Sequence, residues 1–391
     1  MTSLLQRRPD SGLGNIRTSA SAPSRNIDWL LLGAQALICA IGLATVYSAS
    51  YSKVKGDDSP FVFVQRQEIF MILAVILMVV VMSVDYDLWR ERAAMFYVGT
   101  IMLLMLVIAV GAVSGGARLS FDLGPFNVQP AEFAKVTLLM SLSAYLAEER
   151  APRISYARFS GGLVLIGIPA ALIIVQPDLG SASVIIAIAM GVLLVGGARF
   201  KHIALITALA LMTVGAAVIA RIISSYQLRR VTVFLNSDLC NKTKELYDQC
   251  QQVRNSTRAV ANGGILGKGW LQGPITNSRT EIPVQWADFP FSAIGEQFGL
   301  VGGAVLLGLY GIMLFRSFRI AQMSRDTLGT YLCAGAFTMI LWQVFQNVGM
   351  TIGMMPVTGL PLPFISYGGS GLLTFFALMG LVQNVHMRRY R

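Results

Sequence analysis

The sequence is poor in charged residues and has only two histidines. Charged side chains make up 13% of the 391 residues, against roughly a quarter in soluble domains, and hydrophobic residues make up 54%. A water-soluble globular fold is therefore excluded. His202 and His386 fall at predicted helix ends on the side where arginines concentrate, so the opposite face has no histidine for a zinc site or a Ser-His-Asp triad. Chemistry on that face must rest on carboxylates, cations, hydroxyl groups and the backbone.

Cysteine is also scarce, with four residues in the chain. Cys39 and Cys333 lie inside predicted helices, where cysteine acts as a small apolar side chain. Cys240 and Cys250 lie in one long loop on the side that the charge distribution assigns to the oxidising exterior. We hypothesise that these two form a disulfide that closes a short hairpin, which intact-mass measurement with and without reductant would test.

The apolar residues are grouped in blocks close to the roughly 20 residues that cross a bilayer core. Backbone amides at that depth must be bonded within their own segment, so the blocks are predicted to be transmembrane helices. The first block is longer than the apolar region of a signal peptide, which favours a retained helix. We expect an all-α polytopic membrane protein with helices near residues 28–49, 68–84, 95–112, 132–147, 160–175, 180–197, 202–221, 299–316, 329–352 and 369–386.

Arginine and lysine are concentrated on one side of the predicted membrane. The leader, alternate connections and the C-terminal tail carry most of them, whereas the opposite short connections carry only Lys53, Lys55, Arg66 and Arg118. By the positive-inside rule both termini are cytoplasmic. The net charge of +11 is therefore an orientation signal, with some attraction to the anionic inner leaflet, and does not predict nucleic-acid binding.

The chain divides into a leader, one membrane domain and a short tail. Residues 1–27 are rich in Ser, Arg and Gly without apolar periodicity, which predicts a disordered cytoplasmic leader. Residues 28–387 form the membrane domain, and residues 388–391 a cytoplasmic tail. Within the domain, residues 222–298 form an extracytoplasmic loop far longer than any other connection, and its aromatic side chains predict partial order.

Asp288 lies among apolar and aromatic residues just before the eighth predicted helix. Such surroundings raise a carboxylate's pKa towards the range of a general base, unless a cation offsets them. The alternative is a solvated cap in a loop. Glu296 is interpreted as a carboxylate at the start of a helix, where the helix dipole favours negative charge.

Glu132 and Lys135 lie three residues apart after Pro130, which suits the first turn of a helix. Ionisable side chains at membrane depth are costly and face a cavity or each other. The two residues therefore either form a structural pair or line a substrate cavity. The run from Gln176 to Gly180 interrupts an apolar stretch and predicts a tight outward hairpin in which Asp178 caps a helix.

Two segments are rich in glycine. Residues 263–269 lack the spacing and hydroxyl residue of an ATP-binding loop, and form either a flexible turn or a nest of backbone amides at Gly263 and Gly264 for a pyrophosphate. Residues 356–370 contain too much proline and glycine for a helix and carry no charge. Non-helical backbone at membrane depth is tolerated only where it is buried or lines a cavity. We therefore expect this segment, with Ser366, Tyr367 and Ser370, to form the wall of a site open to the outside.

In combination these motifs resemble the family named for shape, elongation, division and sporulation (SEDS), which includes RodA and FtsW. The most specific part is the run from Phe345-Gln-Asn-Val-Gly-Met350 to Ser366-Tyr-Gly-Gly-Ser370. Supporting motifs lie at residues 28–29, 47–50, 116–118, 129–135, 176–180 and 263–269, so the resemblance covers nearly all of residues 28–387.

The resemblance implies a peptidoglycan glycosyltransferase that polymerises the lipid-linked precursor lipid II into glycan strands at the outer membrane face. An essential aspartate of the family corresponds to Asp288, which makes this residue the expected catalytic group. The motif at residues 357–363 and the early Asp28-Trp29 are more similar to RodA than to FtsW, which implies a role in cell elongation. A class B penicillin-binding protein, which is a transpeptidase, is the implied partner.

We expect glycosyl transfer with inversion. Asp288 would take the proton of the attacking sugar hydroxyl, or position a divalent cation, Mg²⁺ or Mn²⁺, that does so; no other cofactor is implied. The leaving polyprenyl diphosphate needs positive charge. The candidates are Arg118, Lys135 and the loop cations Arg229, Arg230 and Arg258. The substrate-binding candidates are Arg118, Glu132, Lys135, Gly263, Gly264, Ser366, Tyr367 and Ser370.

Three departures from the family pattern bear on substrate contacts. Ser120 stands near the place of a common tryptophan, Ala287 replaces a threonine, and Asn255 replaces a glutamine. Two other functions stay open. A lipid II flippase would need polar residues throughout the spans, whereas the ionisable ones cluster near the outer half. A non-catalytic scaffold for the penicillin-binding protein would need no Asp288 chemistry.

Overall fold

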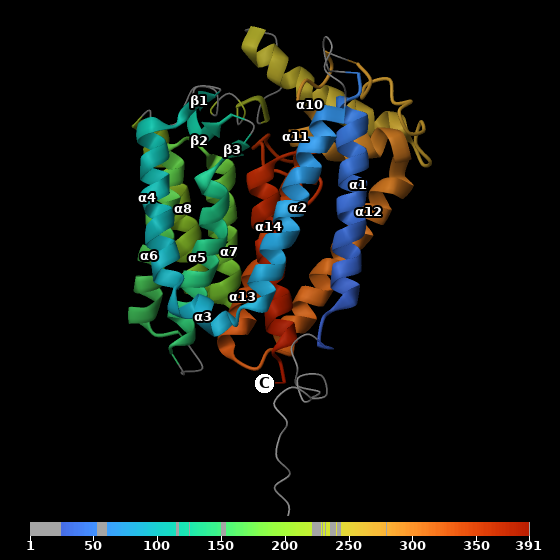
Figure 1. Cartoon of the computed structure of the whole chain (residues 1–391). Coiled ribbons are helices and arrows are strands. Elements are labelled where there is room, and N and C mark those ends of the chain that lie inside the picture. Colours follow the sequence, from blue (N-terminus) through green and yellow to red (C-terminus); the bar gives the residue numbers. More distant parts are fainter. Residues whose placement is uncertain are drawn as a thin grey trace, which may run out of the picture.

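The computed structural model describes residues 25–52, 61–114, 117–124, 126–149, 154–220, 228, 230, 232–234, 240, 244–278 and 280–390. Most of the predicted leader, together with Lys53, Lys55, Gly116 and Arg229, lies outside these ranges. Ten helices of the described residues form one bundle (Figure 1): α1 (Trp29–Ser50), α2 (Phe61–Ser83), α4 (Ala93–Val110), α5 (Pro130–Ala147), α6 (Tyr156–Val175), α7 (Leu179–Val195), α8 (Phe200–Ile219), α12 (Pro290–Gln322), α13 (Thr327–Thr351) and α14 (Gly369–Met387).

Each of these helices coincides with a predicted span, and the polytopic helical fold is confirmed. In the part of the chain that the structure describes, eight of them are long and apolar enough to cross a bilayer. Helix α7 is shorter, with 17 residues, and α5 carries an ionisable pair in its first turns. Helix α12 begins nine residues before the predicted span. It is kinked at Gly299, where φ is 64°, and the part after the kink corresponds to the predicted span.

The two ends of the bundle differ. Figure 1 shows the C-terminus, the short helix α3 (Tyr86–Glu91) and the start of α1 at one end, called here the terminal end. Helices α10 (Lys244–Gly263) and α11 (Gln285–Asp288) and three short strands lie at the opposite end, called here the loop end. At the terminal end Asp28 caps α1 and forms a 2.6 Å ion pair with Arg316 of α12, so the early Asp-Trp motif has a structural role.

A small antiparallel sheet at the loop end was not predicted. Strand β2 (Ala117–Leu123) pairs with β1 (Ala112–Ser114) on one side and with β3 (Phe126–Val128) on the other. The turn between β2 and β3 places Gly124 at a φ of 79°, and the Asp122 carboxylate accepts its N–H. Asp122 and Gly124 are not adjacent, so this turn lacks the Asp-Gly pair by which a hairpin is usually found in a sequence.

The described part of the long loop is anchored to the first turns of α12 through Glu296. This fully buried carboxylate accepts hydrogen bonds from the backbone N–H groups of Ile275 and Thr276, at 3.0 and 2.7 Å, and from the side chain of Asn262. Glu296 therefore organises the loop rather than simply complementing a helix dipole. Buried carboxylates need such partners to offset their desolvation.

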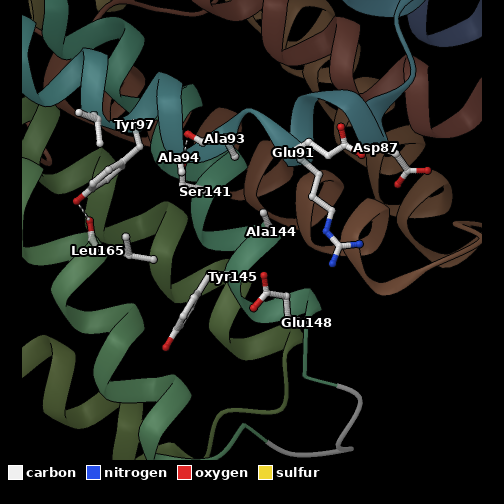
Figure 2. Close-up of a pocket in the computed structure, with 12 residues that line it drawn as sticks. Asp87, Glu91, Ala93, Ala94, Tyr97, Ser141, Ala144, Tyr145, Glu148 and Leu165 are labelled. Carbon is white, nitrogen blue, oxygen red and sulfur yellow. Dashed lines mark hydrogen bonds between the residues drawn. The ribbon is translucent and has the colours of Figure 1, made fainter.

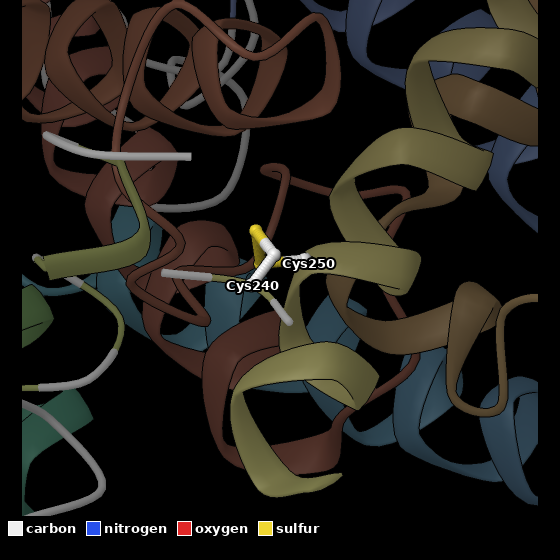
Figure 3. The surroundings of a disulfide bond; sticks show 2 residues. All are labelled: Cys240 and Cys250. Atoms are coloured by element: carbon white, nitrogen blue, oxygen red, sulfur yellow. A yellow bond between two sulfur atoms is a disulfide. The ribbon is translucent and has the colours of Figure 1, made fainter. Parts of the chain in front are cut away.

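Cys240 and Cys250 form a disulfide in the structure (Figure 3). Both side chains are buried, and Cys250 lies on α10, with a Cα–Cα distance of 5.9 Å between the two residues. The bond ties residue 240 to the helix of the loop end.

Candidate active site

Asp288 ends the single-turn helix α11 at the loop end. The next residue, Phe289, is buried in a small apolar cluster with Met350, and the Asp288 side chain itself is half-buried. Burial raises the pKa of the Asp288 carboxyl above its ordinary value, and the positive charge of Arg230 opposes that shift. The raised pKa matches the effect expected from the apolar surroundings, and Arg230 offsets part of it.

Asn347 of α13 joins the backbone of Asp288 to that of Leu360. Its fully buried side chain donates to the Asp288 carbonyl at 3.0 Å and to the Leu360 carbonyl at 2.8 Å. One amide group therefore joins the end of α11 to the segment between α13 and α14. The sequence placed Asn347 within a family motif, but nothing local showed which backbone it holds.

The side chains of Arg230 and Asp288 both lie next to Gly359. Its φ is 73°, and a Cβ at this position would lie 3.5 Å from Nη1 of Arg230 and 3.8 Å from Oδ1 of Asp288. A guanidinium nitrogen and the catalytic candidate thus face the same glycine. Arg230 also donates to the Val357 carbonyl at 3.4 Å and lines a cavity of about 200 Å³ with Phe234 and Met355. Of the loop cations proposed from sequence, the structure brings Arg230 next to Asp288.

The segment 352–368 is non-helical and packs against several helices. Phe364 is buried with a φ of 65°, a strained conformation for this side chain, and it packs on Phe375 and Phe376. The Ser366 hydroxyl accepts the N–H of Leu362 at 2.8 Å and so closes a turn. Residues 362–366 of this segment are buried in the protein, as the membrane-depth argument requires of non-helical backbone.

Tyr367 links the same segment to α11. Its backbone N–H donates to the Trp286 carbonyl at 3.0 Å, and the rings of Tyr367 and Trp286 both pack on Phe63 of α2. The short helix α11 is therefore held at Trp286 by Tyr367 and at Asp288 by Asn347.

Three motifs far apart in sequence meet at Gln129. Its backbone N–H donates to the Ser370 hydroxyl at 3.1 Å, and its side chain donates to the Asp178 carboxylate at 3.2 Å. Asp178 also caps α7, as predicted, by accepting the N–H of Ser181. Ser370 further donates to the Asn127 carbonyl, so its hydroxyl is engaged in joining β3, α5 and α14.

Glu132 and Lys135 form a buried ion pair of 2.5 Å on α5. Both side chains are inaccessible, yet the second carboxylate oxygen of Glu132, Oε2, has no hydrogen-bond partner among the described residues. A Cβ on Gly371 would lie 3.7 Å from that oxygen and 3.7 Å from Pro361. Glu132 and Lys135 therefore form the structural pair that was one of the two predictions. The Oε2 atom of Glu132 has no partner among the described residues and lies near Gly371.

The glycine run at residues 263–269 packs closely against α12. A Cβ at Gly263 would lie 1.9 Å from the Gly295 carbonyl oxygen, and the N–H groups of Lys268 and Gly269 donate to the carbonyls of residues 296 and 297. Gly264 has a φ of 59°, and its carbonyl accepts the N–H of residue 300. These amides already have partners, so the run serves as a packing turn in this structure rather than as an open pyrophosphate nest.

Arg118 lies on β2 and is exposed. Its guanidinium donates to the carbonyls of Ile108 and Ala109 at the end of α4. Arg258 is exposed on α10. Among the described residues, no hydrogen bond or ion pair joins either side chain to Asp288.

The described residues do not form a complete protein site for a metal. No group of three His, Cys, Asp or Glu side chains within them lies close enough to hold an ion. Asp288 with Arg230 as a neighbour is a poor cation site unless the substrate supplies further oxygen ligands.

Comparisons with known proteins match almost the whole chain. A family described as "Cell cycle protein", which comprises FtsW, RodA and SpoVE, matches residues 28–391. The chain is 34% identical to stage V sporulation protein E of Bacillus subtilis, with 92% of this chain and 96% of that protein aligned. It is 32% identical to the peptidoglycan glycosyltransferase MrdB of Escherichia coli, with 81% of this chain and 84% of that protein aligned.

One solved relative is a chain of a peptidoglycan synthase complex that coordinates polymerization and crosslinking. It is 32% identical, with a TM-score of 0.76 over 93% of this chain and 99% of that chain. The similar identities to differently named relatives do not separate the branches, so the elongation role stays a prediction. Sequence, fold and the arrangement of the shared motifs agree, and the chain belongs to the FtsW/RodA/SpoVE family of shape, elongation, division and sporulation proteins.

Proposed function

We propose that the chain is a peptidoglycan glycosyltransferase that polymerises lipid II into glycan strands during cell elongation. The observation that carries this proposal is Asp288, a half-buried carboxylate held by Asn347 and facing Arg230 beside Gly359. The relative MrdB is named for the same activity. A class B penicillin-binding protein is the proposed partner, supported by the similarity to a chain of a synthase complex.

The loop end is proposed to face outward from the bacterial cytoplasmic membrane, with both termini cytoplasmic. The distribution of arginine and lysine supports this orientation, since the leader, the tail and the connections of the terminal end carry most of these residues. The substrate's polyprenyl chain then stays in the lipid, while its sugars and diphosphate reach the loop end.

In the proposed reaction Asp288 accepts the proton of the attacking sugar hydroxyl. The hydroxyl oxygen forms the new bond to the anomeric carbon with inversion, and the bond from that carbon to the polyprenyl diphosphate breaks. The diphosphate leaves with the electron pair. The raised pKa of Asp288 makes it a stronger base than an ordinary carboxylate, and Arg230 lies where it can stabilise the ionised acid or the leaving group.

A divalent cation, Mg²⁺ or Mn²⁺, would supply further positive charge for the diphosphate when bound. Asp288 is the residue proposed to hold it, with substrate oxygens completing the coordination. The roles of Asp288 and Arg230 in proton transfer and charge stabilisation do not depend on that cation.

The proposal is tested with purified chain, its penicillin-binding protein partner and labelled lipid II. We expect glycan strands to form, and to form faster with the partner than without it. If lipid II moves across the membrane of a vesicle and no glycan polymer forms, the chain is a flippase instead. A stable complex that never makes polymer would identify a scaffold.

Replacing Arg230 is expected to shift the pH dependence of polymerisation. The base must be ionised, so activity falls as the pH drops through the pKa of Asp288. Because the charge of Arg230 lowers that pKa, Arg230→Gln should raise it and move the acid limb to higher pH. Arg254→Gln, which removes an exposed cation of α10 that was given no role in the reaction, is the control. An acid limb at the same pH in Arg230→Gln and the native chain would contradict the predicted coupling.

Removing the Asn347 side chain is expected to slow polymerisation by roughly 10- to 100-fold, because Asp288 loses its backbone anchor. Asn384→Ala is a matched control. Asn384 is equally buried and donates to two carbonyls, of Val81 and Val84, at the terminal end. Both variants should lower the melting temperature, but only Asn347→Ala should lower the rate per folded molecule. Equal rates for the two would refute the positioning role.

A further inference from the structure

A second cavity lies at the terminal end, away from Asp288. Its volume is about 830 Å³, within the range of small-molecule sites, and it is formed between α3, α4, α5 and α6 (Figure 2). Small side chains at Ala93, Ala94 and Ala144 leave the space open. Nothing in the proposed polymerisation uses this cavity.

The inner part of the cavity is apolar despite its hydroxyl groups. Tyr97 donates to the Leu165 carbonyl at 2.9 Å, and Ser141 donates to the Ala93 carbonyl at 3.0 Å. With these hydroxyl hydrogens already used, the lining there offers little to a sugar. It suits a hydrocarbon chain.

The outer part of the cavity is charged. Figure 2 shows Asp87, Glu91 and Glu148 on the side away from Tyr97 and Leu165. Because α5 rises about 1.5 Å per residue, Ser141 lies about 10 Å deeper along the helix than Glu148. The cavity therefore runs from a charged mouth to an apolar interior, which matches the two parts of a phospholipid.

The charges at the mouth have opposite signs. Asp87 pairs with Arg325, and Glu148 pairs with Arg158 at 2.9 Å. Arg90 and Glu91 are both exposed, and within the described ranges neither side chain has a hydrogen bond or an ion pair. The Arg90 guanidinium and the Glu91 carboxylate are adjacent in the sequence at the end of α3, and both can bind a ligand.

The cavity also borders the lipid-facing surface. Val98, which lines it, is 49% exposed and lies on α4 between Met95 and Met102, which are 59% and 60% exposed. In a multi-span membrane protein such apolar exposure faces lipid. A lipid can therefore enter sideways from the bilayer.

We propose that this cavity binds a phospholipid whose headgroup carries both a phosphate and a primary ammonium. Arg90 binds the phosphate, Glu91 and Glu148 accept from the ammonium, and the first part of one acyl chain lies against Tyr97, Val98 and Leu165. Arg90, Arg158 and Arg325 balance the three lining carboxylates, so the mouth is close to neutral and favours a zwitterionic headgroup over a purely anionic one.

The test is native mass spectrometry of the purified full chain with phosphatidylethanolamine, phosphatidylglycerol or phosphatidylcholine added singly at equal concentration. We expect one phosphatidylethanolamine to be retained per chain. Arg90→Gln and Glu91→Gln should each weaken its binding by about tenfold, because each removes a charge-assisted bond. Ala94→Leu, which fills the space, should also weaken it. Arg319→Gln, an exposed cation on α12 outside the cavity, should not.

Three results would overturn the proposal: equal retention of phosphatidylglycerol, unchanged retention by Arg90→Gln and Glu91→Gln, or unchanged retention by folded Ala94→Leu. The first two do not depend on the filling variant, because Arg90 and Glu91 are exposed positions whose loss should not unfold the chain. A melting-temperature increase with phosphatidylethanolamine should accompany binding in the native chain and disappear in the Arg90→Gln/Glu91→Gln double variant.

Discussion

Asp288→Asn is expected to reduce the rate of lipid II polymerisation by about 10²- to 10⁴-fold, the usual contribution of a general base. The substitution keeps the shape of the side chain and removes its ability to accept the proton. The rate is measured with purified protein, its partner and labelled lipid II. Asp122→Asn is the control, since Asp122 is an exposed carboxylate at the same loop end that caps a turn.

The same variant should leave the fold and the partner complex intact. The pKa of Asp288 is raised in the folded state, so its contribution to stability is present at low pH and is lost as the pH rises through that pKa. At neutral pH an uncharged amide should therefore not lower the melting temperature. A wild-type rate for Asp288→Asn would exclude this residue as the base, and a lost rate with a lost complex would not support it.

Lys135→Met is expected to destabilise the chain by about 3–5 kcal/mol, because it leaves the Glu132 carboxylate buried without its counter-ion. The double variant Glu132→Gln/Lys135→Met removes both charges and should recover most of the lost melting temperature. Comparing the two variants shows how much the ion pair contributes to the stability of the fold.

Polymerisation should still fall by roughly 10²-fold in the double variant, as expected when a preorganised polar group of an active site is removed. The reason is the Glu132 oxygen that has no partner among the described residues and faces Gly371 and Pro361. The double variant Asp28→Asn/Arg316→Met removes a comparable pair at the terminal end and should keep its rate per folded molecule. Normal polymerisation by the Glu132/Lys135 double variant would leave that pair a structural role only.

Much of the fold follows from the sequence, because an apolar block long enough to cross a bilayer has one stable backbone solution. The ten helices therefore lie where block length places them. The small sheet was missed because β1 and β3 have only three residues each, which is too short to show a period. The early start of α12 was missed because Gly299 kinks the helix where the most apolar stretch begins.

The candidate site divides in the same way. Asp288 could be found from its apolar neighbours and the family resemblance, because both are properties of adjacent residues. The contacts of Asn347 with Asp288 and Leu360, the approach of Arg230 to Gly359, and the meeting of Gln129 with Asp178 and Ser370 join segments far apart in the chain. Side-chain hydrogen bonds across such separations leave no local periodicity. They depend on how the helices pack, and the folded chain alone reveals them.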